Sequence, residues 1–119
     1  ILSDEENEQS DKIKELKTNR LLYEKTVRDL ILLSAPSNYK NIHIDFLNFF
    51  NNTAQAVSKM EEIYSDPAKA VIGVKEYSAE AEKTATLFKN FKNQTIKDKI
   101  KFSPNEDGYI LVRDYFSKI

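Results

Sequence analysis

Turn-forming residues are scarce in this chain, whose 119 residues include two glycines and three prolines. An all-β domain needs a turn signal about every 8–12 residues, and this sequence does not supply them. Leucine, lysine, glutamate and alanine, which favour helices, are plentiful. The sequence therefore predicts a few long helices joined by short connections.

The three prolines divide the chain into segments. Each follows a helix-capping residue by one or two positions, in Ser34-Ala35-Pro36, Ser65-Asp66-Pro67 and Ser103-Pro104. Proline suits the first turn of a helix, where its missing N–H needs no partner. Ser103 and Glu106 also have the spacing of a capping box, in which each residue satisfies a backbone donor near the helix start. The predicted helical segments span about 4–33, 36–64, 67–98 and 104–118.

Apolar residues recur at helical spacing in the first two segments. With about 100° per residue, a broad apolar face of the second segment is centred on Phe46. It comprises Tyr39, Ile42, Phe46, Phe49, Phe50, Thr53, Val57, Met60 and Tyr64. The first segment has a seam of Ile13, Leu16, Tyr23, Val27, Leu30 and Ile31, interrupted by Arg20. Both faces are expected to be buried.

The third and fourth segments have weaker patterns. In the third, a face of mostly small residues comprises Ala70, Val74, Ser78, Ala81 and Ala85, together with Tyr77 and Phe88. Gly73 lies inside this segment and indicates a close helix crossing or a slight kink. The fourth has the stripe Tyr109, Val112, Phe116 and Ile119, although the run Tyr-Ile-Leu-Val also suits a strand. The capping box favours a helix there.

Short turns between long helices make neighbouring helices antiparallel. The fold class predicted is therefore all-α: an antiparallel up-down bundle of three long helices plus a short C-terminal helix. Residues 1–119 are expected to form a single domain. Residues 1–10, which are rich in acidic side chains, are expected to fray.

His43 is the only histidine, and Asp45 follows it two positions later. On a helix the two side chains diverge by about 160°, so they cannot form a catalytic pair. His43 is therefore interpreted as a packing residue at the edge of the buried face. We expect neither a catalytic residue nor a metal or cofactor site, because the sequence also lacks cysteine, a phosphate-binding glycine loop and a zinc or di-iron motif. The chain is predicted not to be an enzyme.

Charge is unevenly distributed, although the formal net charge is only -1. Residues 4–11 carry five acids and no base, and residues 89–101 carry five lysines against Asp98. These lysines could form a patch for an anionic partner such as nucleic acid: Lys89, Lys92, Lys97, Lys99 and Lys101. We consider a nucleic acid the weaker hypothesis, because Phe88 and Phe91 fall near the apolar face and lysines commonly complement a helix C-terminus.

The first segment ends in "LILL", which is apolar all round. Either this turn is enclosed or it offers an apolar patch to a partner. The candidate partner surface lies off the main seam and consists of Leu21, Leu22, Leu32 and Leu33. The function predicted is a non-enzymatic interaction or structural module that binds protein, as a homo-oligomer or with a heterologous partner. A carrier of an apolar ligand in the bundle core is a further alternative.

The start of the chain and its composition suggest an origin. The chain begins Ile-Leu-Ser, which indicates that a leader or an anchor was removed, although a truncated start explains it equally well. No run approaches 18 apolar residues, so membrane association is expected only through a segment absent from this chain. The lysine-rich, arginine-poor composition suggests a bacterial protein. A cell-envelope or secreted location is favoured over the cytoplasm.

Overall fold

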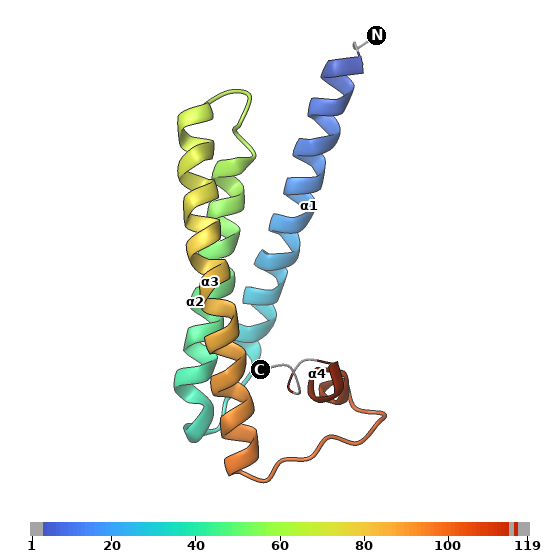
Figure 1. The fold of residues 1–119 in the computed structure, drawn as a ribbon, viewed down its shortest axis with the longest axis vertical. Coiled ribbons are helices and arrows are strands. Elements are labelled where there is room, and N and C mark those ends of the chain that lie inside the picture. The colour runs from blue at the N-terminus through green and yellow to red at the C-terminus, as the bar shows by residue number, and fades with distance from the viewer. Residues whose placement is uncertain (1–3, 115, 117–119) are drawn as a thin grey trace.

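The computed structural model describes residues 4–114 and 116 (Figure 1). Its elements are α1 (Asp4–Leu32), the 3₁₀-helix η1 (Ser37–Tyr39), α2 (Lys40–Met60), α3 (Pro67–Lys97) and α4 (Gly108–Asp114). The described residues contain no strand, so the all-α prediction is confirmed. None of the described helices has the length and apolar character required to cross a bilayer.

The three long helices form an elongated antiparallel arrangement with extents of 58 × 28 × 27 Å. α2 is the central helix, and both α1 and α3 pack against it. Figure 1 shows α2 and α3 as a tight hairpin, while α1 diverges from this hairpin toward its own start. The short α4 lies beside the C-terminal half of α3. The predicted up-down bundle with a short closing helix is confirmed.

Helix starts follow the capping chemistry only in part. Asp66 caps α3, because its carboxylate accepts a hydrogen bond from the Lys69 backbone N–H at 3.2 Å, and Pro67 is the first helical residue. Pro36 precedes a 3₁₀ turn that leads into α2, which begins at Lys40 rather than at the proline. The acidic start of the chain is helical from Asp4 onward.

The fourth helix begins later than predicted. The Ser103 backbone N–H donates to the Glu106 carboxylate at 2.9 Å, which is one half of the expected capping box. The Glu106 N–H donates back to the Ser103 carbonyl at 2.9 Å, so the segment closes as a turn and α4 starts only at Gly108. The ring of Phe102 packs against Gly108, where a side chain would collide with it. The side chain of Val112 and the whole of Ile119 lie outside the described residues.

The core is built from small residues at the centre and aromatic rings toward one end. Ala54, Ala56 and Val57 of α2 are buried. The ring of Phe46 packs edge-on against Phe88 and Phe91 of α3, with centroids 5.4 and 6.1 Å apart. The predicted apolar face of α2 is therefore correct, except that Tyr64 beyond the end of the helix is 46% exposed.

Gly73 marks a close crossing between α2 and α3. A Cβ atom at this position would lie 2.6 Å from the Ala56 carbonyl oxygen and 2.8 Å from the Lys59 Cβ. Such separations are shorter than van der Waals contact, so only glycine lets the two backbones approach this closely. The close-crossing interpretation of Gly73 is confirmed.

The predicted face of α3 is wrong for most of its length. Val74, Tyr77, Ser78, Ala81 and Ala85 are exposed, whereas Gly73, Glu80 and Thr95 are buried. Of the predicted face, Ala70 is buried and Phe88 packs against Phe46. The buried face is therefore rotated by about 80° around the helix from the predicted one. The reason is that α3 packs mainly on α2, and the close approach at Gly73 determines which side meets it.

Candidate functional site

Five large apolar residues of α1 and of the position just after it are exposed, and we call them the leucine face. Their exposed fractions are 47% for Leu21, 59% for Leu22, 64% for Ile31, 84% for Leu32 and 62% for Leu33. The last turn of α1 is thus not enclosed, and all four leucines predicted as a partner surface are exposed. Ile31, which the sequence placed on the buried seam, is exposed as well. Its exposure follows from its position near the end of the helix.

The leucine face consists of two stripes along α1. Residues 11 positions apart complete about three helical turns, so Leu21 lies in line with Leu32, and Leu22 lies in line with Leu33. The two stripes are about 100° apart around the helix. Lys25 and Asp29 lie between the stripes and form an ion pair at 2.8 Å. The middle of the face is therefore electrically balanced.

The side of α1 that faces α2 is only partly buried, because none of its residues reaches full burial. Arg20, which interrupts the apolar seam, donates to Glu24 at 2.9 Å and to Glu61 after the end of α2 at 2.5 Å. The hydrogen bonds and charges of both carboxylates raise the pKa of the Arg20 guanidinium. Since this polar contact occupies the seam, the exposed leucines remain available for another partner.

An apolar cavity of about 490 Å³ lies where α1 turns into α2. Phe46, Phe50, Phe88 and Phe91 form much of its wall, and Leu33 of the leucine face lies at the same cavity. The other residues that line it are Thr26, Leu30, Ser34, Ala35, Pro36, Tyr39, Ile42 and His43. Among the described residues that line this cavity there is no aspartate, glutamate, lysine or arginine, so it suits an uncharged group.

Tyr39 is the one described residue whose buried side-chain polar atom lacks a hydrogen-bond partner. Burial raises the pKa of the Tyr39 hydroxyl, and the nearby Asp98 carboxylate raises it further. Asp98 itself accepts hydrogen bonds from Asn38 at 2.6 Å and from Gln94 at 3.1 Å. The hydrogen bond from Asn38 links the end of α3 to the turn that follows α1.

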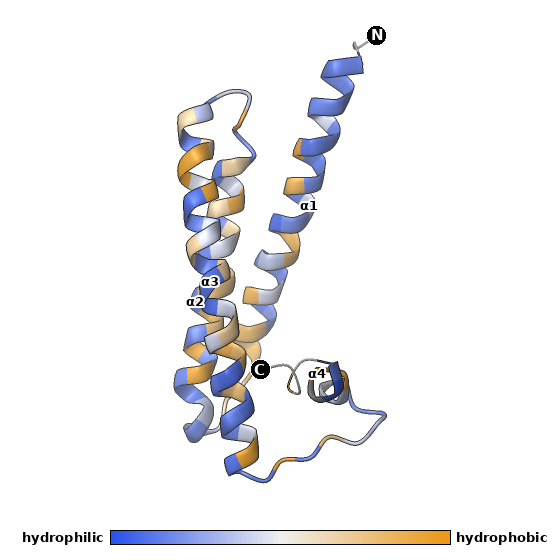
Figure 2. Ribbon diagram, in the orientation of Figure 1, coloured by the Kyte–Doolittle hydropathy of each residue, from blue (hydrophilic) through white to orange (hydrophobic). Residues whose placement is uncertain are grey.

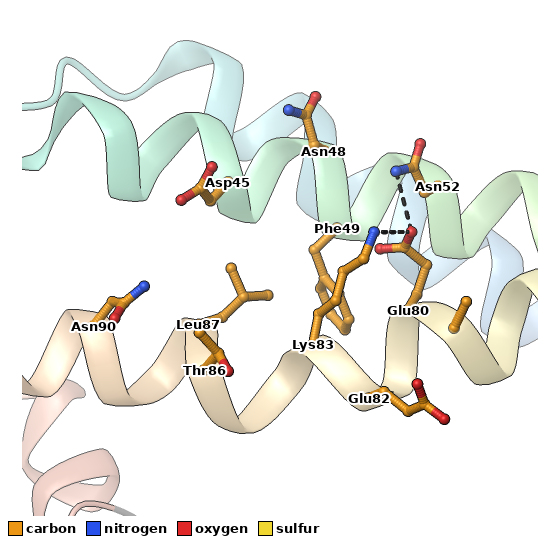
Figure 3. A pocket seen from close by; sticks show the side chains of 11 residues that line it. Asp45, Asn48, Phe49, Asn52, Glu80, Glu82, Lys83, Thr86, Leu87 and Asn90 are labelled. Atoms are coloured by element: carbon orange, nitrogen blue, oxygen red, sulfur yellow. Dashed lines mark hydrogen bonds and ion pairs between the residues drawn. The ribbon is translucent and has the colours of Figure 1, made fainter.

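A second, polar cavity of about 700 Å³ lies between α2 and α3 (Figure 3). The carboxylate of Glu80 is only 7% exposed and accepts hydrogen bonds from Asn52 at 3.3 Å and from Lys83 at 2.8 Å. Figure 3 shows Asp45 apart from this cluster, on α2. Because Lys83 and Asn52 satisfy Glu80, the arrangement accounts for a buried charge without requiring a ligand.

His43 and Asp45 are not brought together. His43 lines the apolar cavity and Asp45 lines the polar one, so the two side chains point to different sides of α2. The interpretation of His43 as a packing residue at the edge of the buried face agrees with this position. Within the described ranges, no group of three or more histidine, aspartate or glutamate side chains is arranged to hold a metal ion.

The five lysines predicted as a patch for an anionic partner differ in their surroundings. Lys92 donates to the Phe116 carbonyl oxygen, and Lys99 adopts a left-handed conformation with φ 56° that terminates the helix. Lys89, Lys97, Lys99 and Lys101 are exposed. The neighbouring rings of Phe88 and Phe91 are packed in the aromatic core, so they are not available as platforms for bases.

The chain matches no protein-family model, no curated protein sequence and no solved structure. Its own geometry is thus the basis for a functional hypothesis. Sequence reasoning identified the leucines of α1, but it missed the apolar cavity as a specific site. A signal for the cavity was present in the aromatic residues at positions 46, 50, 88 and 91, which lie on two helices that must meet.

Proposed function

We propose that this protein is an interaction module that binds a protein partner through the leucine face of α1. The observation that carries the proposal is the exposure of five large apolar residues along α1 and just after it, up to 84% for Leu32. Single exposed apolar residues are common on protein surfaces, but two clusters of them along one helix are typical of an interaction site.

The energetics of the face are adequate for specific binding. Burying a leucine or isoleucine fully is worth about 1.5–3 kcal/mol, so five partly exposed side chains provide on the order of 5–10 kcal/mol. Association costs at least about 4 kcal/mol in lost translational and rotational freedom. The leucine face therefore supports a moderate affinity, which neighbouring charges can increase.

The experiment is site-specific photo-crosslinking in the source cells. A benzophenone amino acid is placed at Leu22 or Leu32, and, as a matched control, at Ser58, an exposed position of α2. We expect discrete protein adducts from both leucine positions and none from Ser58. Equal labelling at all three positions, or no adduct from either leucine, would contradict an interaction role for this face.

The apolar cavity favours a second candidate function, transport or storage of a small uncharged apolar molecule. Its volume of about 490 Å³ falls in the range of ligand sites in proteins. A neutral fluorescent dye, N-phenyl-1-naphthylamine, tests it. The variant Ala35→Phe fills the cavity, whereas Ala68→Phe changes an exposed alanine elsewhere. Dye fluorescence that is lost only in Ala35→Phe supports the ligand site, and equal fluorescence in both variants contradicts it.

A further inference from the structure

The two charged segments of the chain lie at opposite ends of the molecule. The acidic segment, residues 4–11, forms the start of α1, and the basic segment, residues 89–101, includes the end of α3. Figure 1 shows the start of α1 at one end of the long axis and the end of α3 at the other. With a long axis of 58 Å, the two segments cannot pair within one copy.

We infer that the partner of the leucine face is a second copy of this chain, bound antiparallel. This inference rests on the proposed function and specifies the partner. A two-fold axis perpendicular to the long axis places the acidic segment of each copy beside the basic segment of the other, and both pairs form at once. A parallel arrangement would place like charges together, which is unfavourable.

The spacing of the leucine face fits the same symmetry. In an antiparallel pair of α1 helices with the axis near residues 26 and 27, Leu21 of one copy faces Leu32 of the other. Leu22 of one copy lies opposite Leu33 of the other, at nearly the same level along the pair. Because of the two-fold symmetry each contact occurs twice. The cluster at Leu21 and Leu22 of each copy therefore covers the cluster at Leu32 and Leu33 of the other. The leucine face is in this way complementary to itself, as an isologous interface requires.

The register also brings the charged segments together. Residues 4–11 of one copy then extend about 15–25 Å past the end of α1 in the other copy, at 1.5 Å per residue. The hydrogen bond between Asn38 and Asp98 places the end of α3 directly beside the turn that follows α1. Lys97, Lys99 and Lys101 therefore lie on the path of the acidic segment.

A charge-swap experiment tests this arrangement by sedimentation velocity. One triple variant carries Glu5→Lys, Glu8→Lys and Asp11→Lys, and the other carries Lys89→Glu, Lys97→Glu and Lys101→Glu. All six positions are exposed, so both variants are expected to fold, as circular dichroism will verify. We expect the unmodified chain to dimerise, with a Kd that rises at least tenfold in high salt because screening weakens the charge pairing.

Each variant alone is expected to dimerise at least tenfold more weakly, because the acidic and basic segments then carry the same sign. An equimolar mixture is expected to recover the original affinity as a heterodimer, since opposite charges meet again at both ends. Recovery supports the antiparallel dimer. A mixture no tighter than the separate variants overturns it.

The variant Leu21→Glu, Leu32→Glu separates the two proposals. Loss of dimerisation in this variant, together with recovery in the charge-swapped mixture, supports both proposals. Dimerisation that depends on the leucines but not on the charges overturns the antiparallel register and leaves the interaction role standing. If the unmodified chain stays monomeric at about 1 mM while Leu32 crosslinks to a different protein, the antiparallel dimer is likewise overturned and the interaction role stands. A monomer without any crosslinked partner overturns both.

Discussion

The guanidinium of Arg20 in α1 lies against the carboxylate of Glu61, with its Nε 2.5 Å from the Glu61 Oε2. The two residues are 41 positions apart, and their side chains are 21% and 14% exposed. This contact joins the middle of α1 to the end of α2. It fixes the position of α1, and hence of the leucine face, relative to the α2–α3 hairpin.

Removal of one partner of this pair should destabilise the protein. For Glu61→Leu we expect the free energy of unfolding to fall by about 1–3 kcal/mol, because a partly buried guanidinium loses one of its two carboxylates. The double variant Arg20→Leu, Glu61→Leu should recover most of that loss, since leucine completes the apolar seam. Urea denaturation of the two single variants and the double variant measures this coupling. Additive losses would show that the pair is not coupled.

Gly73→Ala should be strongly destabilising, although alanine is the better helix former by about 1 kcal/mol. The new Cβ would lie 2.6 Å from the Ala56 carbonyl oxygen, so α3 must move away from α2. We expect a net loss of about 2–3 kcal/mol by thermal or urea unfolding. The control is Ala85→Gly at an exposed position of the same helix, with an expected loss of about 1 kcal/mol. A stabilised Gly73→Ala variant would contradict the close crossing.

The exposed stripe of α3 should tolerate polar substitution. Ala81→Gln and Ala85→Gln are each expected to change the free energy of unfolding by less than about 0.5 kcal/mol, because both positions face solvent. Ala56→Gln, at a fully buried position of α2, should cost more than about 3 kcal/mol. Large losses at positions 81 and 85 would restore the face that the sequence alone predicts.

Tyr39→Phe removes a buried hydroxyl that has no hydrogen-bond partner in the described part of the chain. At pH 7 we expect this variant to be as stable as the unmodified protein or more stable by up to about 1 kcal/mol. Denaturant titration at constant pH provides the measurement. A loss above about 1 kcal/mol would mean that the hydroxyl donates to the Asp98 carboxylate in solution.

Alkaline pH should weaken the fold through Tyr23 and Tyr39. Burial raises the pKa of both phenols above the usual value of about 10, with the Tyr77 hydroxyl contributing at Tyr23. The folded state therefore favours the neutral phenols. Their contribution to the free energy of unfolding is complete below about pH 10 and is lost as pH rises through the raised pKa values. The double variant Tyr23→Phe, Tyr39→Phe should lose less stability between about pH 9 and 11. Parallel pH profiles for the two proteins would refute this linkage.

The sequence alone determined that the chain forms long helices and which side of the central helix, α2, is buried. The positions of Pro67 and Asp66 fix the start of α3 through chemistry that is local to a few residues. The apolar period through Phe46 fixes which side of α2 is buried, because a helix with many large apolar residues on one side has only one way to cover them. The divergence of His43 and Asp45 follows from the same periodicity. In Figure 2 the start of α1 is mostly hydrophilic, whereas hydrophobic residues recur along α2 and α3 and at the end of α1.

Tertiary structure decided the face of α3 and the exposure of the leucines. By apolar content alone, Val74 and Ala85 were expected on the buried side of α3. In the structure a different side of α3 meets α2, because the backbones approach closely at Gly73 and Glu80 is buried with hydrogen-bond partners. A periodicity argument does not detect such effects, since glycine has no side chain to count and a buried carboxylate depends on partners from another helix. The placement of Leu32 in solvent depends likewise on where neighbouring helices end, which no local pattern contains.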